Sequence, residues 1–197
     1  MEIKDIVSNV AVYGLEESFK RSKYPMSVNI DKCTTEYTKT IEHLGTAKPG
    51  SGHDNFLKGI VVQFDLTFTI KAWTEAERYH FFDIVSSQST MHCISKFDIK
   101  QQCVEYVDDR IIAIVQELVD TYNNLDTENE KEKKEAYLNL LYNVPVGFKL
   151  TAGMTTNYQQ LKTIYQQRNN HRLPEWVLLC KWMLSLPHSK LITGKDK

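Results

Sequence analysis

The sequence has little that would place the protein in a membrane, on nucleic acid or outside the cell. Its formal net charge is only −1, so no excess of basic residues favours binding to DNA, RNA or an anionic membrane surface. No stretch approaches the roughly 20 apolar residues of a membrane span, and residues Met1 to Asp5 lack the apolar segment of a secretory signal. These absences predict a cytoplasmic protein with no nucleic-acid or membrane partner.

The sequence also lacks closely spaced cysteines. Cys33, Cys93, Cys103 and Cys180 include no CxxC pair, which argues against a structural zinc site. His92 precedes Cys93, but no further ligand stands at a suitable spacing, so we predict no metal site. Free and mostly buried thiols agree with a reducing compartment.

The composition is that of an ordinary globular domain. Apolar residues make up 42% and aromatic residues 11% of the 197 residues, which is enough for a substantial core. The sequence contains no internal repeat and no low-complexity tract. We therefore predict a single domain over residues 1–197.

One long strand organises the predicted fold. From Ile60 to Lys71, apolar and polar residues alternate, and this period of two is typical of a strand with one buried face. Such a strand needs partners, and residues 27–33 and the segment around Phe148 are the candidates. The buried face would carry Val62, Phe64, Leu66, Phe68 and Ile70.

A helix is predicted soon after this strand. Thr74 and Glu77 have the spacing of a capping box, in which each side chain accepts a hydrogen bond from the other residue's backbone N–H. The helix would carry His80 and Asp83, three residues apart. A salt bridge between them is one interpretation, and an acid–base couple is the other.

The remaining predicted elements are mostly helical. Asp98 would cap a long helix that ends near Asn124, because apolar residues follow it at helical spacing. Residues 47–56 form a flexible loop that carries His53. Residues 126–135 form an exposed loop or the start of a helix. A short strand is expected at residues 146–150, and helices at residues 9–22, 35–44, 136–142, 157–168 and 174–186.

Two separate blocks of the sequence carry a recognisable pattern. In the first, a histidine-bearing loop that begins with HDNF at residue 53 leads into the long strand and a helix. The second spans residues 144–171, and five of its residues stand in a characteristic register: Pro145, Thr155, Asn157, Leu161 and Arg168. Together the blocks resemble the flavin-dependent thymidylate synthases of the ThyX class. This resemblance implies an α+β, ThyX-like single domain with a central antiparallel or mixed sheet flanked by helices.

The resemblance implies roles for four polar residues in catalysis and substrate binding. Arg168 corresponds to the arginine that grips the nucleotide substrate, and His92 falls on the last serine of the family's RHRxxSxNExS signature, so both are candidate catalytic residues. Arg78 and Ser87 are candidate substrate-binding residues together with Arg168. From the residues alone, Arg168 is a surface arginine near a helix end, and Arg78 is an ion-pair partner of Glu75 or Asp83.

Three further residues are cofactor candidates on the same resemblance. His53 lies in the loop before the strand, Asn157 matches a flavin-contacting asparagine, and His171 follows at about the family interval. Asn157 has an alternative role as the N-cap of the helix that starts there, and His171 as part of a polar loop. The implied cofactors are FAD and folate, and the implied assembly is a homotetramer with shared sites.

The family's phosphate-binding signature is missing. In an alignment without gaps, Phe82, Asp83 and Ile84 occupy the RHR positions. Two guanidiniums are thereby replaced with apolar side chains and a carboxylate is added, which removes paired contacts to phosphate and adds repulsion. FAD binding in the family's manner is therefore not expected.

Three functions remain open from the sequence. The first is a divergent enzyme that acts on a pyrimidine deoxynucleotide such as dUMP, with flavin and folate. The second is a non-catalytic protein of the same fold that binds a nucleotide between subunits. The third is a structural or interaction protein that binds a protein partner.

Overall fold

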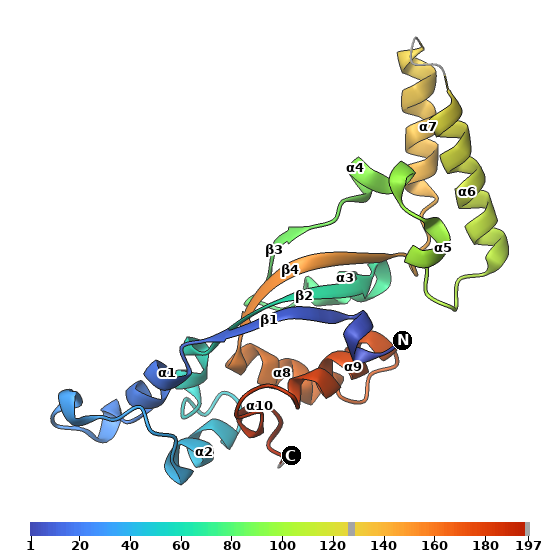
Figure 1. Cartoon of the computed structure of the whole chain (residues 1–197). Coiled ribbons are helices and arrows are strands. Elements are labelled where there is room, and N and C mark those ends of the chain that lie inside the picture. Colours follow the sequence, from blue (N-terminus) through green and yellow to red (C-terminus); the bar gives the residue numbers. More distant parts are fainter. Residues whose placement is uncertain (126–128, 196–197) are drawn as a thin grey trace. The chain divides into compact units, whose positions relative to one another are not determined.

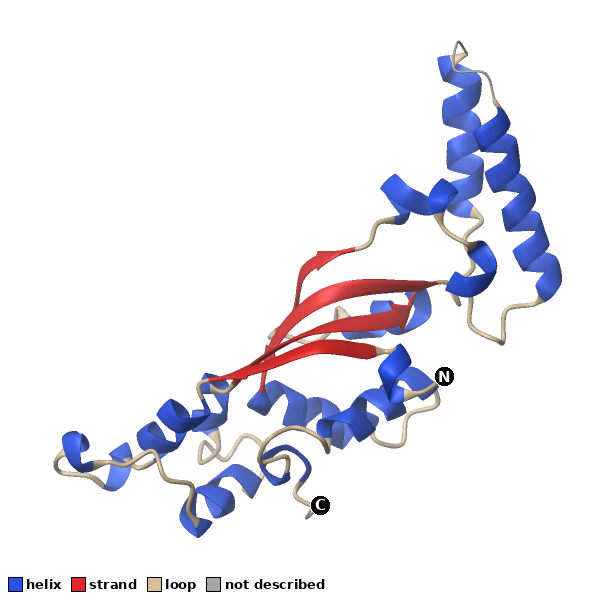
Figure 2. Cartoon of the chain, viewed as in Figure 1, coloured by secondary structure: helices blue, strands red, loops and turns tan. Residues whose placement is uncertain are grey.

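The computed structural model describes residues 1–125 and 129–195, and its fold is α+β (Figure 1). A four-stranded sheet has the order β1-β2-β4-β3, and helices flank it (Figure 2). The predicted fold class is therefore confirmed. The strands are β1 (Val7–Tyr13), β2 (Val61–Thr69), β3 (Phe82–Ser87) and β4 (Lys149–Asn157).

The helices that the structure describes range from single turns to a helix of 16 residues. The α-helices are α1 (Leu15–Ser22), α2 (Lys39–Thr46), α3 (Ile70–Ala76), α4 (Thr90–Cys93), α5 (Ile99–Gln102), α6 (Asp109–Asn124), α7 (Glu130–Tyr142), α8 (Tyr158–Arg168), α9 (Pro174–Met183) and α10 (Lys190–Thr193). Short 3-10 helices lie at Ile3–Asp5, Tyr24–Met26, Ile30–Lys32, Asn55–Gly59 and Ile94–Lys96. None of these described helices combines the length and the apolar character needed to cross a bilayer.

The long strand β2 is confirmed, and it lies inside the sheet. Its apolar face is 0–2% exposed at the four residues Val62, Phe64, Leu66 and Phe68, while the alternate side chains up to Thr67 are more accessible. This is the outcome that an alternating pattern predicts for a strand with one buried face.

Strand β4 is the partner predicted around Phe148. Backbone N–H groups of Ile70 and Tyr158 donate to the carbonyls of Phe148 and Ile60, at 2.9 and 3.0 Å. Partner numbers fall along one strand as they rise along the other, so the pair is antiparallel. The alternative partner, residues 27–33, is wrong: that segment contains a 3-10 helix capped by Asn29.

Strand β1 is the second partner of β2, and the sequence did not predict it. Residues 9–22 were expected to form one helix, but Val7–Tyr13 pair antiparallel with β2, and only the later part is helical. Gly14 makes the change of direction, with φ of +76°. A Cβ atom there would lie 2.4 Å from the carbonyl oxygen of Gly59, so a side chain is excluded.

The expected capping box at Thr74 and Glu77 is also wrong. Helix α3 begins directly at Ile70, where the Thr69 hydroxyl accepts from the N–H of Ala72 at 3.1 Å, and it ends at Ala76. The Thr74 hydroxyl instead donates to the carbonyl of Lys71. The residues expected to continue the helix form β3, whose hydrogen bonds come from pairing rather than from local sequence.

The long helix α6 begins ten residues later than predicted, with Asp108 as its N-cap. Asp98 is an N-cap, but of the short helix α5, where it accepts from the N–H of Gln101 at 3.0 Å. Of the predicted segment 126–135, residues 126–128 lie outside the described residues, and the rest begins α7. Of the short strand expected at 146–150, only residues 149 and 150 are in a strand, where they begin the longer β4.

The chain divides into two compact units. The first comprises Met1–Leu66, Ala76–Val85 and Gly153–Lys197, and the second comprises Thr67–Glu75 and Ser86–Ala152. The expectation of a single domain stays a prediction.

Large aromatic side chains form the core of the first unit. Phe64 of β2 lies 4.7 Å from Trp182 of α9 and 6.2 Å from Phe82 of β3, measured between ring centroids. Trp176 of α9 and Tyr158 of α8 are fully buried in the same unit. Burial of each side chain of this size contributes about 1.5–3 kcal/mol, so helices α8 and α9 are held firmly in this unit.

The second unit has its own apolar core. Helices α6 and α7 lie side by side (Figure 1), and the ring of Phe97 contacts that of Phe148 with centroids 5.6 Å apart. The buried cluster consists of Ile94, Ile99, Cys103, Val115, Val119, Leu140 and Phe148.

Candidate functional site

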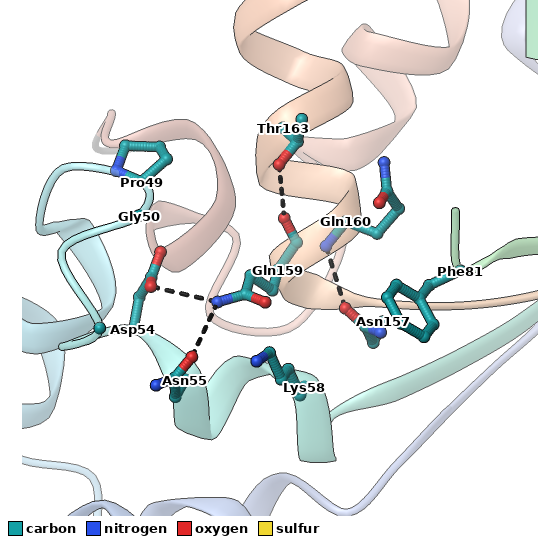
Figure 3. Close-up of a pocket in the computed structure, with 11 residues that line it drawn as sticks. Pro49, Gly50, Asp54, Asn55, Lys58, Phe81, Asn157, Gln159, Gln160 and Thr163 are labelled. Atoms are coloured by element: carbon teal, nitrogen blue, oxygen red, sulfur yellow. Dashed lines mark hydrogen bonds between the residues drawn. The ribbon is translucent and has the colours of Figure 1, made fainter. Parts of the chain in front are cut away.

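A polar pocket of about 460 Å³ lies within the first unit (Figure 3). It is formed by the glycine-rich loop, the 3-10 helix Asn55–Gly59, the turn before β3 and the first turns of α8. Its volume falls in the range of about 300–1,000 Å³ that is usual for small-molecule sites. The lining residues are Pro49, Gly50, Gly52, Asp54, Asn55, Lys58, Phe81, Asn157, Gln159, Gln160 and Thr163.

A buried ion pair fixes the loop side of the pocket to α8. The side chains of Lys162 and Asp54 are 4% and 1% exposed, and their charged atoms lie 2.8 Å apart. The Lys162 ammonium also donates to the carbonyls of Gly45 and Ala47, at 2.7 and 2.5 Å. All three of its protons are therefore used, which offsets the cost of burying the charge.

The amide side chains of the pocket are only partly used by the protein. Gln159 donates to the carboxylate of Asp54 at 3.2 Å, and the Asn157 side-chain oxygen accepts from the N–H of Gln160 at 2.9 Å (Figure 3). Asn157 is thus the N-cap of α8, as one of its two predicted roles required. Within the described part of the chain, the Asn157 amide nitrogen, the Gln160 side-chain amide and the Lys58 ammonium donate to no other group. These groups are available to a ligand.

The opposite end of α8 carries the Arg168 cluster, which we define as Arg168, His171, Tyr79 and Trp176. The Arg168 Nε atom donates to the Tyr79 hydroxyl at 2.7 Å, and its Nη1 atom lies 2.7 Å from Nε2 of His171. Its guanidinium carbon is 4.8 Å from the ring centroid of Trp176. The structure therefore brings together two predicted site residues, Arg168 and His171, and engages the guanidinium with side chains of the protein.

Burial also shapes the chemistry of Cys180 in this region. Helix α9 places its thiol in the core, and desolvation raises the pKa of Cys180 to about 12, while the charge of Arg168 acts in the opposite direction. The thiol is therefore protonated at neutral pH and is a poor nucleophile.

The other predicted site residues are more dispersed. His53 is exposed on the loop between the pocket residues Gly52 and Asp54, and Arg78 is exposed in the turn after α3. Ser87 and His92 belong to the second unit, where both are exposed.

Two predicted ion pairs do not form among the described residues. Arg78 pairs with neither Glu75 nor Asp83, and Glu75 instead binds Lys71 at 2.9 Å. His80 and Asp83 make no salt bridge either, because Asp83 lies on a strand rather than on the predicted helix. The described residues also contain no group of three or more metal-ligating side chains.

The positions of the missing signature do not fit FAD phosphates. Phe82 is buried in the core of the first unit, and Asp83 and Ile84 are exposed on β3. None of their side chains offers a donor to a phosphate, and the Asp83 carboxylate would repel one. These three positions therefore do not form a phosphate site for FAD.

Sequence reasoning missed Lys58, Phe81 and the pair Gln159 and Gln160. The two glutamines follow Asn157 directly, so its assignment could have drawn attention to them. Lys58 closes the segment that begins with the glycine-rich loop. No local signal identified Phe81, since the expected helix placed it in a regular element.

The chain resembles known proteins in fold rather than in sequence. No protein-family model and no curated protein sequence matches the chain. A solved structure of ThyX from Helicobacter pylori, complexed with FAD and dUMP, is 16% identical with a TM-score of 0.70, covering 100% of both chains. The chain has the ThyX fold. A second Helicobacter pylori ThyX structure with FAD and dUMP is 14% identical with a TM-score of 0.69, covering 96% of this chain and 98% of that one.

Proposed function

We propose that this ThyX-like protein binds a pyrimidine mononucleotide of the dUMP type in the polar pocket at the start of α8. The observation that carries the proposal is the set of unused donors on Lys58, Asn157 and Gln160 around a pocket of nucleotide scale. The fold likeness adds support, because the two similar structures are complexes with dUMP.

Each group of the pocket has a matching group on a nucleotide. An ammonium such as Lys58 binds phosphate as a point charge, and the first turn of α8 presents the positive end of its dipole to the same region. Amide side chains both donate and accept, so Asn157 and Gln160 suit the carbonyl and N–H edge of a pyrimidine. A phosphate with a polar base satisfies both sets at once.

A divergent thymidylate synthase is the second candidate, because both similar structures contain FAD besides dUMP. In that case Arg168 and His92 would serve catalysis, Arg78 and Ser87 would join Arg168 on the substrate, and His53, Asn157 and His171 would contact the flavin. FAD would need a binding mode without the RHR arginines. A homotetramer with the nucleotide at a subunit interface belongs to this proposal, and light scattering during gel filtration measures the assembly.

Calorimetric titration of the purified protein with dUMP tests the first candidate. We expect binding without flavin, and a thermal shift that grows with ligand as about RT ln(1 + [L]/Kd). Absorbance of the purified protein tests the second candidate, since bound oxidised flavin would colour it yellow. Absence of any thermal shift across dUMP, dCMP, dTMP and FAD would remove both, and a stoichiometric protein partner in a pull-down would then favour an interaction protein.

A charge-matched pair of variants locates the binding site. Lys58→Gln removes the ammonium that lines the pocket, whereas Lys39→Gln removes an exposed ammonium on α2 that does not line it. We expect a loss of dUMP affinity of about tenfold for the first and none for the second, with unfolding free energies within about 0.5 kcal/mol of the parent for both. Equal affinities for the two variants would place the nucleotide elsewhere.

A further inference from the structure

Phe81 has a backbone conformation that a bulky residue rarely adopts. Its φ is +59°, in the left-handed region where Gly and Asn are common and large side chains are not. A residue held there destabilises the fold unless its surroundings compensate, and such residues cluster at ligand sites. Local folding alone therefore does not explain why a phenylalanine stands at this position.

This conformation turns two consecutive phenylalanines in opposite directions. Phe82 enters the core and is 4% exposed, whereas Phe81 is 64% exposed. The Thr156 hydroxyl, on the neighbouring strand β4, donates to the carbonyl of Phe81 at 2.6 Å and holds the turn. The protein thus fixes the backbone firmly and gains little from burying the ring.

The ring of Phe81 stands at the polar pocket beside Asn157 (Figure 3). Among the described residues that line the pocket, it supplies the one aromatic surface; the others are polar or small, apart from Pro49. An apolar plane next to unused amide groups is complementary to a flat ring with polar edges. A sugar phosphate without a base would satisfy Lys58 and leave the plane uncovered.

We propose that the base of the ligand stacks on the ring of Phe81. This contact makes the pocket bind nucleotides more tightly than sugar phosphates. The inference rests on the proposed nucleotide binding and adds the residue that recognises the base face. Stacking is tolerant of base identity because every base has a π-face. Phe81 therefore distinguishes base from no base, while Asn157 and Gln160 read the edge.

Three substitutions separate the ring from the backbone. Phe81→Asn accepts the left-handed conformation but has no ring, Phe81→Leu keeps apolar bulk without a π-face, and Phe81→Tyr keeps the ring. Titration with dUMP and with deoxyribose 5-phosphate gives two affinities for each variant. We expect Phe81→Asn and Phe81→Leu to lose about 5- to 100-fold in dUMP affinity, and Phe81→Tyr less than about threefold. The weaker deoxyribose 5-phosphate affinity should stay unchanged throughout.

The melting temperature of the free variants supplies a ligand-independent measurement. Because Asn adopts this φ readily, Phe81→Asn should melt at the parental temperature or above it. A markedly lower melting temperature would show that the ring stabilises the fold, and would overturn the proposal.

The outcomes also separate this inference from the proposed function. Parental dUMP affinity in Phe81→Asn or Phe81→Leu overturns the stacking role and leaves nucleotide binding in place. Equal losses for dUMP and deoxyribose 5-phosphate overturn it too, since they indicate a damaged pocket rather than a lost base contact. A parent protein that binds no nucleotide removes both.

Discussion

The two ends of α8 differ in how their polar groups are used. Around the pocket at the first turns, Asn157, Gln160 and the neighbouring Lys58 of the 3-10 helix keep donors that no described residue takes up. At the last turn, the guanidinium of Arg168 contacts Tyr79, His171 and Trp176 of its own unit. Both ends belong to the block that resembles ThyX, yet Arg168, the residue expected to bind the substrate, is already held by side chains of the protein.

A residue type in the right register therefore does not by itself make a binding group. A guanidinium stacked on an aromatic ring and hydrogen-bonded to a hydroxyl must lose those contacts before it can turn to a ligand. An ammonium or amide without internal partners has no such cost.

The largest effect is expected at Lys162, in the middle of α8. Lys162→Met leaves the Asp54 carboxylate buried without its partner, so the unfolding free energy in urea should fall by about 3–5 kcal/mol. The loop side of the pocket should loosen at the same time, and dUMP affinity should fall. Adding Asp54→Asn to this variant removes the unpaired charge and should recover part of the stability; no recovery would contradict the ion-pair explanation.

A smaller loss is expected for Arg168→Ala. It removes a hydrogen bond to Tyr79 and the contact with the Trp176 ring, so the unfolding free energy should fall by about 2 kcal/mol. Arg168→Lys keeps the charge, so its unfolding free energy should lie between those of the parent and of Arg168→Ala. Titration of the folded variants with dUMP tests whether Arg168 binds the ligand. Unchanged affinity supports a purely structural role for Arg168, whereas a loss of affinity would support substrate binding, as the resemblance implies.

Asn157 separates capping from ligand binding at the open end. Asn157→Ala removes the cap and should cost about 1 kcal/mol of unfolding free energy. Asn157→Asp keeps an oxygen that accepts from Gln160 but loses the amide donors and adds a negative charge. Its stability should therefore match the parent while its dUMP affinity falls, and parental affinity would leave Asn157 with the capping role alone.

The stability of the protein at alkaline pH tests the burial of Cys180 near Arg168. Burial raises its pKa from 9.0 to about 12, so the unfolded state loses the thiol proton first and stability falls as pH rises above 9. Between pH 8 and pH 10 the expected loss is about 1 kcal/mol, measured by urea unfolding at each pH. Cys180→Ala should flatten this slope. Burial and Glu42 raise the pKa of Tyr37 to about 12, so Tyr37 lowers the stability only above about pH 10.

Some elements were predictable because their signals are local. The alternation along β2 identified the central strand, and Asn157 identified the start of α8, because side-chain periodicity and capping act within a few residues. Asp98 shows the limit of such signals, since its cap was correct and the length of the helix after it was not.

By itself, the sequence determined the fold class, the central strand and the start of the helix that borders the pocket. The tertiary structure decided that Val7–Tyr13 and Phe82–Ser87 are strands, because a strand obtains its hydrogen bonds from a partner distant in sequence. It also decided which polar groups remain unused. Arg168 contacts other side chains because Tyr79 and Trp176 pack around its end of α8, whereas Lys58 has no such neighbours among the described residues. No short stretch of sequence encodes this packing.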